Sequence, residues 1–255
     1  MPLTYLITGC NRGIGLEYLR YLSQETTNII IGTVRDKSKI NGGLAELLKE
    51  HKNIFIVTLD LSSQSSIDQV VSQIEEVTPD GIDIFINNAA LSKTPVSLID
   101  DTWENHIDHY KANALGPVKL FKAIKPFLNK KDTKKVIFTS TGLAGIQNFY
   151  DHSATVYSMS KAALNFAVRS LDHDLRGEGF IIVATEPGIC DTDLFNEGFD
   201  TVKDSLPEEY VKAVRAALKP PKTAAVGILE HVVNKITIED GGKWLSWDQG
   251  KENVY

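Results

Sequence analysis

Apolar runs of strand length recur along this 255-residue chain, and stretches with helical spacing separate them. The runs cover residues 3–8, 28–34, 54–59, 82–86, 136–140 and 180–185. Several of them, such as NIIIGTV and FIIVAT, are nearly continuous in apolar residues, which is typical of strands that helices cover on both faces. The order of elements therefore predicts an α/β fold, a doubly wound parallel β-sheet with helices on both faces.

Helices are expected between these strands, over 13–24, 43–51, 64–77, 103–127, 154–176 and 223–235. Serines at the start of the third helix predict an N-cap there. No linker or repeat divides the chain, so we expect a single domain over 1–255. Residues 191–221 interrupt the alternation with a long mixed segment that ends in KPPK, and we interpret them as a substrate lid. In such a sheet, ligands bind at the carboxyl ends of the strands.

The composition favours a globular enzyme over a nucleic-acid-binding or membrane protein. The chain has 27 Lys+Arg and 33 Asp+Glu, a net charge of −6, and its compact basic run at 130–135 is explained by a solvated turn. Apolar runs fall short of the roughly 18 residues that a membrane span needs. Cys10 and Cys190 lack C-x-x-C or zinc spacing, and the first strand begins near Leu3 with no room for a leader. We therefore expect a cytoplasmic protein without a metal.

A glycine-rich turn follows the first strand in LITGCNRGIG. Gly9, Gly13 and Gly15 allow a tight turn that brings backbone N–H groups and a helix N-terminus close to a pyrophosphate. The spacing differs from the common G-x-G-x-x-G fingerprint, and a turn that needs glycine only for packing is the alternative. Its place directly after the first strand favours dinucleotide binding.

The end of the second strand indicates which dinucleotide binds. NAD requires a carboxylate there for the ribose 2′-hydroxyl, whereas NADP requires a cation for the 2′-phosphate. The chain reads IIIGTVRD, so Thr33 or Val34 occupies the position of the acid and Arg35 follows. Arg35 and Arg12 offer two guanidinium groups to a phosphate, which predicts NADPH/NADP as the cofactor. In the alternative interpretation, Asp36 pairs with Arg35.

Tyr157 and Lys161 lie four residues apart in a helical pattern, which places them on one face of the helix. A tyrosine hydroxyl has a pKa of about 10, so it is a weak acid–base group at neutral pH unless a cation stabilises the phenolate. The Lys161 ammonium is expected to supply that stabilisation. Tyr157 could then donate a proton to a carbonyl oxygen while hydride arrives from a nicotinamide. A Y-x-x-x-K pair by itself is more often a solvated helix face.

Six ordered motifs give the chain a resemblance to the short-chain dehydrogenase/reductase family over essentially its whole length. They are TGCNRGIG at 8–15, LDLSS at 59–63, NNAA at 87–90, NALGP at 113–117, YSMSK at 157–161 and PGICDTDL at 187–194. With GGKWLSWD near the end, the chain is most similar to sniffer-like carbonyl reductases and fungal ketoreductases. The resemblance implies a Rossmann-type fold. Ala90 departs from the family's usual glycine and crowds the backbone near the cofactor.

The resemblance also implies roles for individual residues. Asp60 would accept a hydrogen bond from the adenine amino group, and Asn87 would approach the ribose. Asn113 would bind a water molecule and complete a proton relay, unless it is an ordinary polar residue on its helix. The implied cofactor-binding residues are Gly9, Asn11, Arg12, Gly13, Ile14, Gly15, Arg35, Asp60, Leu61, Asn87, Tyr157, Lys161, Pro187, Gly188, Ile189 and Thr192.

A hydroxyl at the end of the fifth strand would polarise the substrate carbonyl. The family pattern has two serines there, of which the second is usually catalytic, and this chain reads FTSTGLAG, with Ser140 first and Thr141 second. Strand alternation sends the two side chains to opposite faces, so only one of them can be the donor. Thr141 is the first choice, Ser140 becomes competent if the register shifts by one, and Ser153 is a remote third possibility.

Several further side chains are candidates for the pocket. Tyr150 and His152 lie on the loop before the catalytic helix, and apolar side chains of the lid could fold over the substrate. His106 and His109 are three residues apart without further ligands nearby, so a helix surface or subunit interface is expected instead of a metal site. Trp244 and Trp247 belong either to the pocket or to the core.

The sequence thus predicts an NADPH-dependent carbonyl reductase that converts a ketone or aldehyde to an alcohol. Its partner would be a small-molecule carbonyl substrate, without nucleic acid or membrane, and the family resemblance implies a homodimer or homotetramer. Two alternatives are an NAD-dependent secondary-alcohol dehydrogenase and a catalytically silent dinucleotide-binding sensor.

Overall fold

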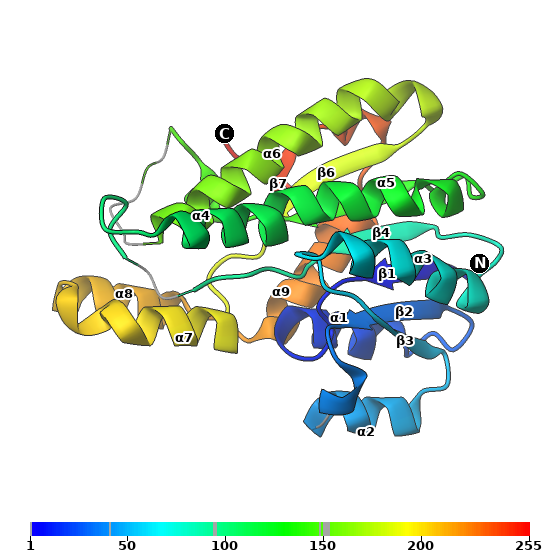
Figure 1. The fold of residues 1–255 in the computed structure, drawn as a ribbon, viewed down its shortest axis with the longest axis horizontal. Helices are drawn as coiled ribbons and strands as arrows, with labels where there is room; N and C mark the ends of the chain where they lie inside the picture. Colours follow the sequence, from blue (N-terminus) through cyan, green and yellow to red (C-terminus); the bar gives the residue numbers. More distant parts are fainter. Residues whose placement is uncertain (1, 41, 94–95, 148, 150–153) are drawn as a thin grey trace.

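The chain folds around one parallel β-sheet of seven strands, seen in the computed structural model of Figure 1. The structure describes residues 2–40, 42–93, 96–147, 149 and 154–255. The strands lie in the order β3-β2-β1-β4-β5-β6-β7, so the strand order reverses between β1 and β4. Their bounds are β1 Thr4–Ile7, β2 Ile29–Val34, β3 Ile54–Thr58, β4 Ile84–Asn87, β5 Lys135–Thr139, β6 Ile181–Glu186 and β7 Trp244–Ser246.

Helices cover both faces of this sheet (Figure 1). One face carries α3 (Gln64–Val77), α4 (Trp103–Tyr110), α5 (Gly116–Leu128) and α6 (Thr155–Leu175). The other carries α1 (Gly13–Leu22), α2 (Gly42–Glu50) and α9 (Pro221–Gly227). Two π-helical segments, η2 (Lys111–Leu115) and η6 (Ile228–Val233), join α4 to α5 and continue α9. This is the predicted doubly wound Rossmann-type arrangement.

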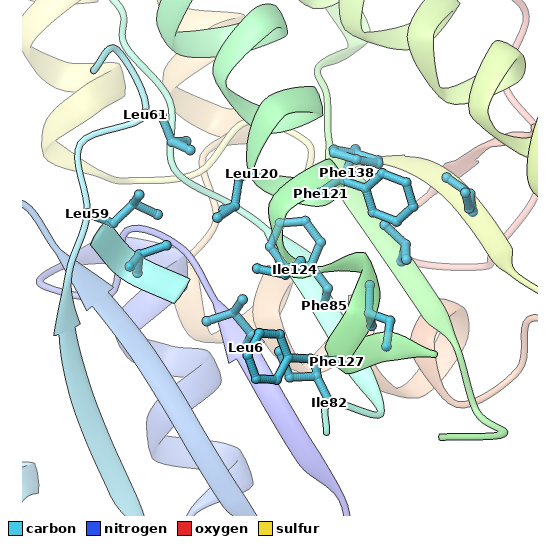
Figure 2. Packing of buried hydrophobic residues seen from close by; sticks show 14 of the residues in the cluster. Leu6, Leu59, Leu61, Ile82, Phe85, Leu120, Phe121, Ile124, Phe127 and Phe138 are labelled. Atoms are coloured by element: carbon cyan, nitrogen blue, oxygen red, sulfur yellow. The ribbon is translucent and has the colours of Figure 1, made fainter. Parts of the chain in front are cut away.

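The core under α3, α5 and α6 is aromatic and aliphatic. Figure 2 shows Phe85, Phe121 and Phe138 among Leu120 and Ile124. The ring centroids of Phe85 and Phe138 are 6.0 Å apart in an edge-to-face contact, a favourable geometry for two aromatic rings. Such packing fixes β4 and β5 beneath α6, and so fixes the strand ends from which the candidate site is built.

The pattern of apolar runs predicted six of the strands within a few residues, together with the six helical segments. The predicted N-cap of α3 is confirmed, because the Ser63 side chain accepts a hydrogen bond from the Ser66 backbone N–H. The segment expected as one helix over 103–127 is continuous but contains the π-helical turn η2. Strand β7 was not predicted, since three residues are too short to give a periodic signal.

Residues 191–221, which we call the lid segment, contain two helices that the sequence did not predict. They are α7 (Asp193–Val202) and α8 (Glu208–Ala217), drawn in yellow and orange below the sheet's carboxyl edge in Figure 1. The two ends of the segment pair with each other, because Lys219 N–H donates to Ile189 O at 3.0 Å and Asp191 N–H donates to Lys219 O at 2.9 Å. The lid segment therefore leaves and re-enters the domain at one place.

Candidate active site

The glycine-rich turn after β1 has the geometry of an anion-binding loop. Gly9 and Gly13 have φ of 72° and 59°, in the left-handed region that favours glycine. Helix α1 begins at Gly13, and its N-cap residue Arg12 makes no side-chain cap, so the first N–H groups of α1 are available to an outside acceptor. Asn11 and Ile14 complete the turn. The turn therefore fits the pyrophosphate of a dinucleotide.

Two side chains beside this turn, those of Thr8 and Asn88, hold it against the end of β4. Thr8 Oγ1 accepts hydrogen bonds from the backbone N–H groups of Asn88 and Ala89, at 3.0 and 2.9 Å. Asn88 Nδ2 donates to the carbonyls of Thr8 and Gly9. A Cβ at Gly15 would lie 2.1 Å from Gly9 O, so this glycine is required by the close approach. Thr8 and Asn88 lie within the motifs TGCNRGIG and NNAA, but the sequence analysis assigned them no role.

Asn87 lies at the end of β4, and its side chain is fully buried. Oδ1 accepts from Thr8 Oγ1 at 3.4 Å, whereas Nδ2 has no partner among the described residues. An unpaired buried amide N–H is costly, and Asn87, like Ser140, has almost no accessible surface through which a ligand could reach it. Asn87 lies at the predicted strand end, and its approach to the cofactor ribose stays a prediction.

At the end of β2 the exposed cation is Arg35. Thr33, one of the two positions considered for an acid, is buried, and its hydroxyl accepts from Gly9 N–H at 3.3 Å. Val34 is buried as well. Asp36 accepts hydrogen bonds from the Ser38 backbone N–H and hydroxyl, at 2.9 and 2.7 Å, so it caps a short 3-10 turn. The alternative pairing of Asp36 with Arg35 is therefore wrong: the cation nearest Asp36 is Lys39, at 3.8 Å.

Arg12 has a partner that the sequence did not predict. Its Nη1 lies 2.8 Å from Asp193 Oδ2 and 3.1 Å from Glu197 Oε1, both on α7 of the lid segment. Two carboxylates thus compete with the phosphate that Arg12 is expected to contact. All three side chains are at least half exposed.

The residues expected around the adenine lie after β3. Asp60 is half-buried, and Oδ1 accepts from the Ser62 N–H and hydroxyl at 2.9 and 2.6 Å. Leu61 is buried against the start of α5, where a Cβ at Gly116 would collide with Leu61 O. One Asp60 oxygen is used to form the turn.

The loop after β6 carries Pro187, Gly188, Ile189 and Thr192. Gly188 has a φ of 68°, and its N–H donates to Glu186 Oε2 at 2.7 Å. Thr192 begins α7 as its N-cap, accepting from Phe195 N–H. A Cβ at Gly13 would lie 3.3 Å from the Thr192 methyl, so this loop faces the glycine turn across a narrow gap.

Burial dominates the electrostatics of the Tyr157–Lys161 pair. The Lys161 ammonium lies 5.9 Å from the centroid of the Tyr157 ring and donates to Thr139 O at 2.7 Å. Burial raises the pKa of Tyr157 to about 12 and lowers the pKa of Lys161 to about 7. Burial therefore opposes the expected lowering of the tyrosine pKa by Lys161 in the protein by itself. Tyr157 is a protonated phenol at neutral pH, which suits a proton donor.

Ser140 and Thr141 differ in exposure and in partners. Ser140 is 2% exposed, and its Oγ has no partner among the described residues. Thr141 is half-buried and caps the 3-10 turn η3 (Gly142–Ala144), where its Oγ1 accepts from Leu143 N–H at 3.3 Å. Because that bond uses an oxygen lone pair, the hydroxyl hydrogen of Thr141 stays available for donation. The turn η3 packs against α6.

Asn113 is fully buried in the π-helical turn η2, and both of its side-chain N–H donors have partners. Oδ1 accepts from Leu91 N–H at 2.7 Å, and Nδ2 donates to Leu91 O at 2.8 Å and Ser160 Oγ at 3.0 Å. The side chain therefore has no free donor for a water molecule and acts as a clamp between the loop after β4 and α6. The π-turn shifts a backbone bond to Gly116 N–H→Lys111 O, a distortion often found at functional sites.

His109 assists the same clamp. It is buried, Nε2 accepts from Lys93 N–H at 3.3 Å, and burial lowers its pKa. The expectation that His109 lies on a helix surface or at a subunit interface is wrong. The side chain contacts the backbone of Lys93 in the loop after β4, and such a contact has no periodic sequence signal. Among the residues that the structure describes, no group of His, Cys, Asp and Glu side chains could hold a metal ion.

Three expected pocket residues, Tyr150, His152 and Ser153, lie outside the described residues. Trp244 is buried in the core and makes a tilted ring contact with Tyr255, whereas the Lys219 ammonium lies 4.6 Å from the ring centroid of Trp247. In the described part of the chain, no helix combines the length and apolar character needed to cross a membrane.

Comparisons with known proteins place this site in context. A family model described as short chain dehydrogenase matches residues 4–203. The chain is 36% identical to an uncharacterized oxidoreductase of Saccharomyces cerevisiae (99% of this chain, 98% of the relative) and 34% identical to a short chain dehydrogenase of Penicillium aethiopicum (97% and 98%). Its fold is similar to the NADPH-bound carbonyl reductase from chicken fatty liver (TM-score 0.86, 26% identity, covering 100% of this chain and 94% of that one). It is also similar to the carbonyl reductase Sniffer of D. melanogaster (TM-score 0.85, 27% identity, 100% of both chains).

Proposed function

The chain belongs to the short chain dehydrogenase family of oxidoreductases, and within that family we propose that it is an NADPH-dependent reductase of ketones or aldehydes. The observation that carries the proposal is the Tyr157–Lys161 pair: a protonated phenol on the first turns of α6, beside a buried lysine, at the carboxyl edge of the sheet. A dinucleotide-binding sensor has no need of this pair.

The proposed reaction divides the work among three side chains. A nicotinamide bound at this site would supply hydride to the carbonyl carbon. Tyr157 donates its proton to the carbonyl oxygen, and its high pKa keeps it protonated for this purpose at neutral pH. Thr141 donates a hydrogen bond that stabilises the charge developing on that oxygen. Lys161, held by Thr139 O, stabilises the phenolate that remains.

We assign the hydroxyl donor to Thr141 and a structural place to Ser140. A substrate oxygen can reach only a hydroxyl with accessible surface, and Ser140 is almost fully buried. Asn113 is proposed to be a positioning residue that holds Ser160, and with it the catalytic turn of α6, through the Nδ2–Oγ bond of 3.0 Å.

The cofactor is proposed to lie along the glycine turn, with its pyrophosphate at the N-terminus of α1. Arg35 favours NADPH over NADH, because the end of β2 offers an exposed cation and the Asp36 carboxylate already caps its own turn.

Arg35→Asp is expected to weaken NADPH binding about 10- to 100-fold, because it removes a charge-assisted hydrogen bond and introduces charge repulsion. NADH binding should change by less than threefold. Titration of both cofactors by fluorescence measures the ratio, and an equal loss for both would refute the assignment.

Turnover tests the function itself. Purified protein with NADPH is mixed with a panel of diketones, ketoesters and aldehydes, and NADPH absorbance is followed. We expect oxidation of NADPH with at least one class of carbonyl, and much slower oxidation of NADH. Measurable NADPH binding without turnover of any substrate would favour the sensor. Faster oxidation of secondary alcohols with NAD would favour the dehydrogenase alternative.

We further propose that 1–255 functions as one dinucleotide-binding domain, that the lid segment covers the substrate, and that the protein is located in the cytoplasm.

A homodimer or homotetramer is proposed to form through α4, η2 and α6, which pack side by side. They expose the side chains of Trp103, Tyr110 and Phe166, at 76%, 50% and 78%. Phe166→Glu should convert the oligomer to monomer in light scattering, whereas Phe55→Glu, on the far edge strand β3, should not. A monomeric parent protein would contradict the proposal.

A further inference from the structure

Asp193 and Glu197 of the lid segment face the glycine turn through Arg12. We infer that these two carboxylates compete with a phosphate group of the cofactor for Arg12, and so lower cofactor affinity and link cofactor binding to release of the lid segment. The inference rests on the proposed function for the identity of the cofactor. Neither Asp193 nor Glu197 is among the residues that the family resemblance implies for cofactor binding.

The first step is the position of Arg12. It is the N-cap residue of α1, so its guanidinium originates next to the helix terminus that has no side-chain cap. An anion bound at that terminus comes within reach of this long, half-exposed side chain. A guanidinium binds phosphate and carboxylate oxygens with the same N–H groups. Arg12 cannot satisfy two carboxylates and a phosphate fully at once.

The second step is how α7 is held. Thr192 lies next to Gly13, and the two ends of the lid segment pair at Ile189, Asp191 and Lys219. Beyond that base, α7 and α8 bind each other: Arg215 lies 2.7 Å from Asp200 and 5.1 Å from the Phe199 ring centroid. The lid helices thus form a unit of their own, and the Arg12 pairs tie this unit to the glycine turn.

The third step is the strength of this tie. The Arg12, Asp193 and Glu197 side chains are 51%, 59% and 62% exposed, and exposed pairs are individually weak. A doubly charged phosphate can therefore displace the carboxylates, but the competition reduces apparent affinity. Removing the two carboxylate charges should tighten cofactor binding about 2- to 10-fold.

The test uses Asp193→Asn/Glu197→Gln in the full-length protein, with NADPH and NADH dissociation constants measured by fluorescence titration. The matched control is Asp200→Asn/Glu208→Gln, which removes the same charge from the lid helices at residues that pair with Lys203, Arg215 and Lys212. We expect tighter binding in the first variant and an unchanged constant in the control. Tighter binding of NADPH alone would identify the 2′-phosphate as the competing group. Equally tighter binding of both cofactors would identify the pyrophosphate.

A second readout follows the lid segment directly by hydrogen exchange. In the parent protein, NADPH should increase exchange in α7, and in the double variant exchange should already be high without cofactor. Equal affinities in parent and variant, or affinities that rise equally in the control, would overturn the inference. Failure of every form to bind NADPH or NADH would instead refute the proposed function, so the two failures are distinguishable.

Discussion

The helix α6 and the lid segment lie at the same edge of the sheet but are held in different ways. Lys161 is buried and bonded to Thr139 O, and Ser160 is clamped by Asn113, which is itself bonded twice to the Leu91 backbone. The lid helices meet the glycine turn through exposed ion pairs of Arg12. Buried bonds are costly to break, whereas exposed pairs exchange readily. The contrast suggests that proton transfer requires fixed positions and that substrate entry requires movable ones.

The largest expected effect comes from the α6 side of this comparison. Tyr157→Phe removes the proton donor and should lower kcat/KM about 1,000-fold, within the range for a general acid. NADPH affinity should stay within threefold, since the ring remains. Steady-state kinetics and cofactor titration measure both. An equal change from a lid variant such as Phe195→Leu would erase the proposed difference between the two regions.

A smaller effect is expected from the hydroxyl at the end of β5. Thr141→Ala should lower kcat/KM about 100-fold, as the loss of one hydrogen-bond donor to a developing oxyanion does. Thr141→Ser should restore most of the activity, because it returns the hydroxyl. Ser140→Ala should cost less than fivefold. The reverse order of the two alanine variants would move the donor to Ser140, and small equal losses would remove the donor from the mechanism.

The burial of Lys161 predicts a pH-dependent stability. Its folded-state pKa, about 7, lies below the ordinary value of 10.5, so the unfolded chain binds more protons between these pH values. The contribution of this group to the free energy of unfolding therefore rises with pH through that interval and is least favourable at pH 7 and below. Lys161→Met should raise the free energy of unfolding by on the order of 1–3 kcal/mol at pH 6, and by less at pH 9.

Urea denaturation of parent and variant at pH 6 and pH 9 measures this difference. Lys212→Met, at an exposed lysine of α8, serves as the control and should show no dependence on pH. If Lys161→Met destabilises the protein equally at both pH values, the lysine is held as a fully charged group, and the described burial does not control its ionisation.

The sequence was sufficient to predict six of the seven strands and the loops at their carboxyl ends. Continuous apolar runs identify buried parallel strands, and glycine turns mark the strand ends. It was not sufficient for α7 and α8, whose stability comes from contacts such as Arg215 with Asp200 and Phe199, made by residues distant in sequence. The pairing of Arg12 with the lid, 181 residues away, likewise has no local signal.

The sequence predicted only part of the chemistry of the site, because the burial of each side chain depends on the fold. Spacing alone places Tyr157 and Lys161 on one helix face, but only the fold shows that burial raises one pKa and lowers the other. In the same way, the sequence ranks Thr141 before Ser140 only through the family pattern, and the fold adds the difference in their exposure. The clamp formed by Asn113 and His109 depends on a π-turn and a loop that periodicity does not encode.

The central claim is that NADPH reduces a carbonyl at Tyr157. It is tested most directly by incubating the protein with a carbonyl substrate and NADPH that carries deuterium in both positions at C4 of the nicotinamide ring, followed by mass spectrometry of the product. We expect one deuterium on the carbinol carbon of the alcohol formed by the parent protein, and almost no alcohol from Tyr157→Phe at equal cofactor saturation. Undiminished alcohol formation by Tyr157→Phe, or alcohol without deuterium at that carbon, would contradict the account.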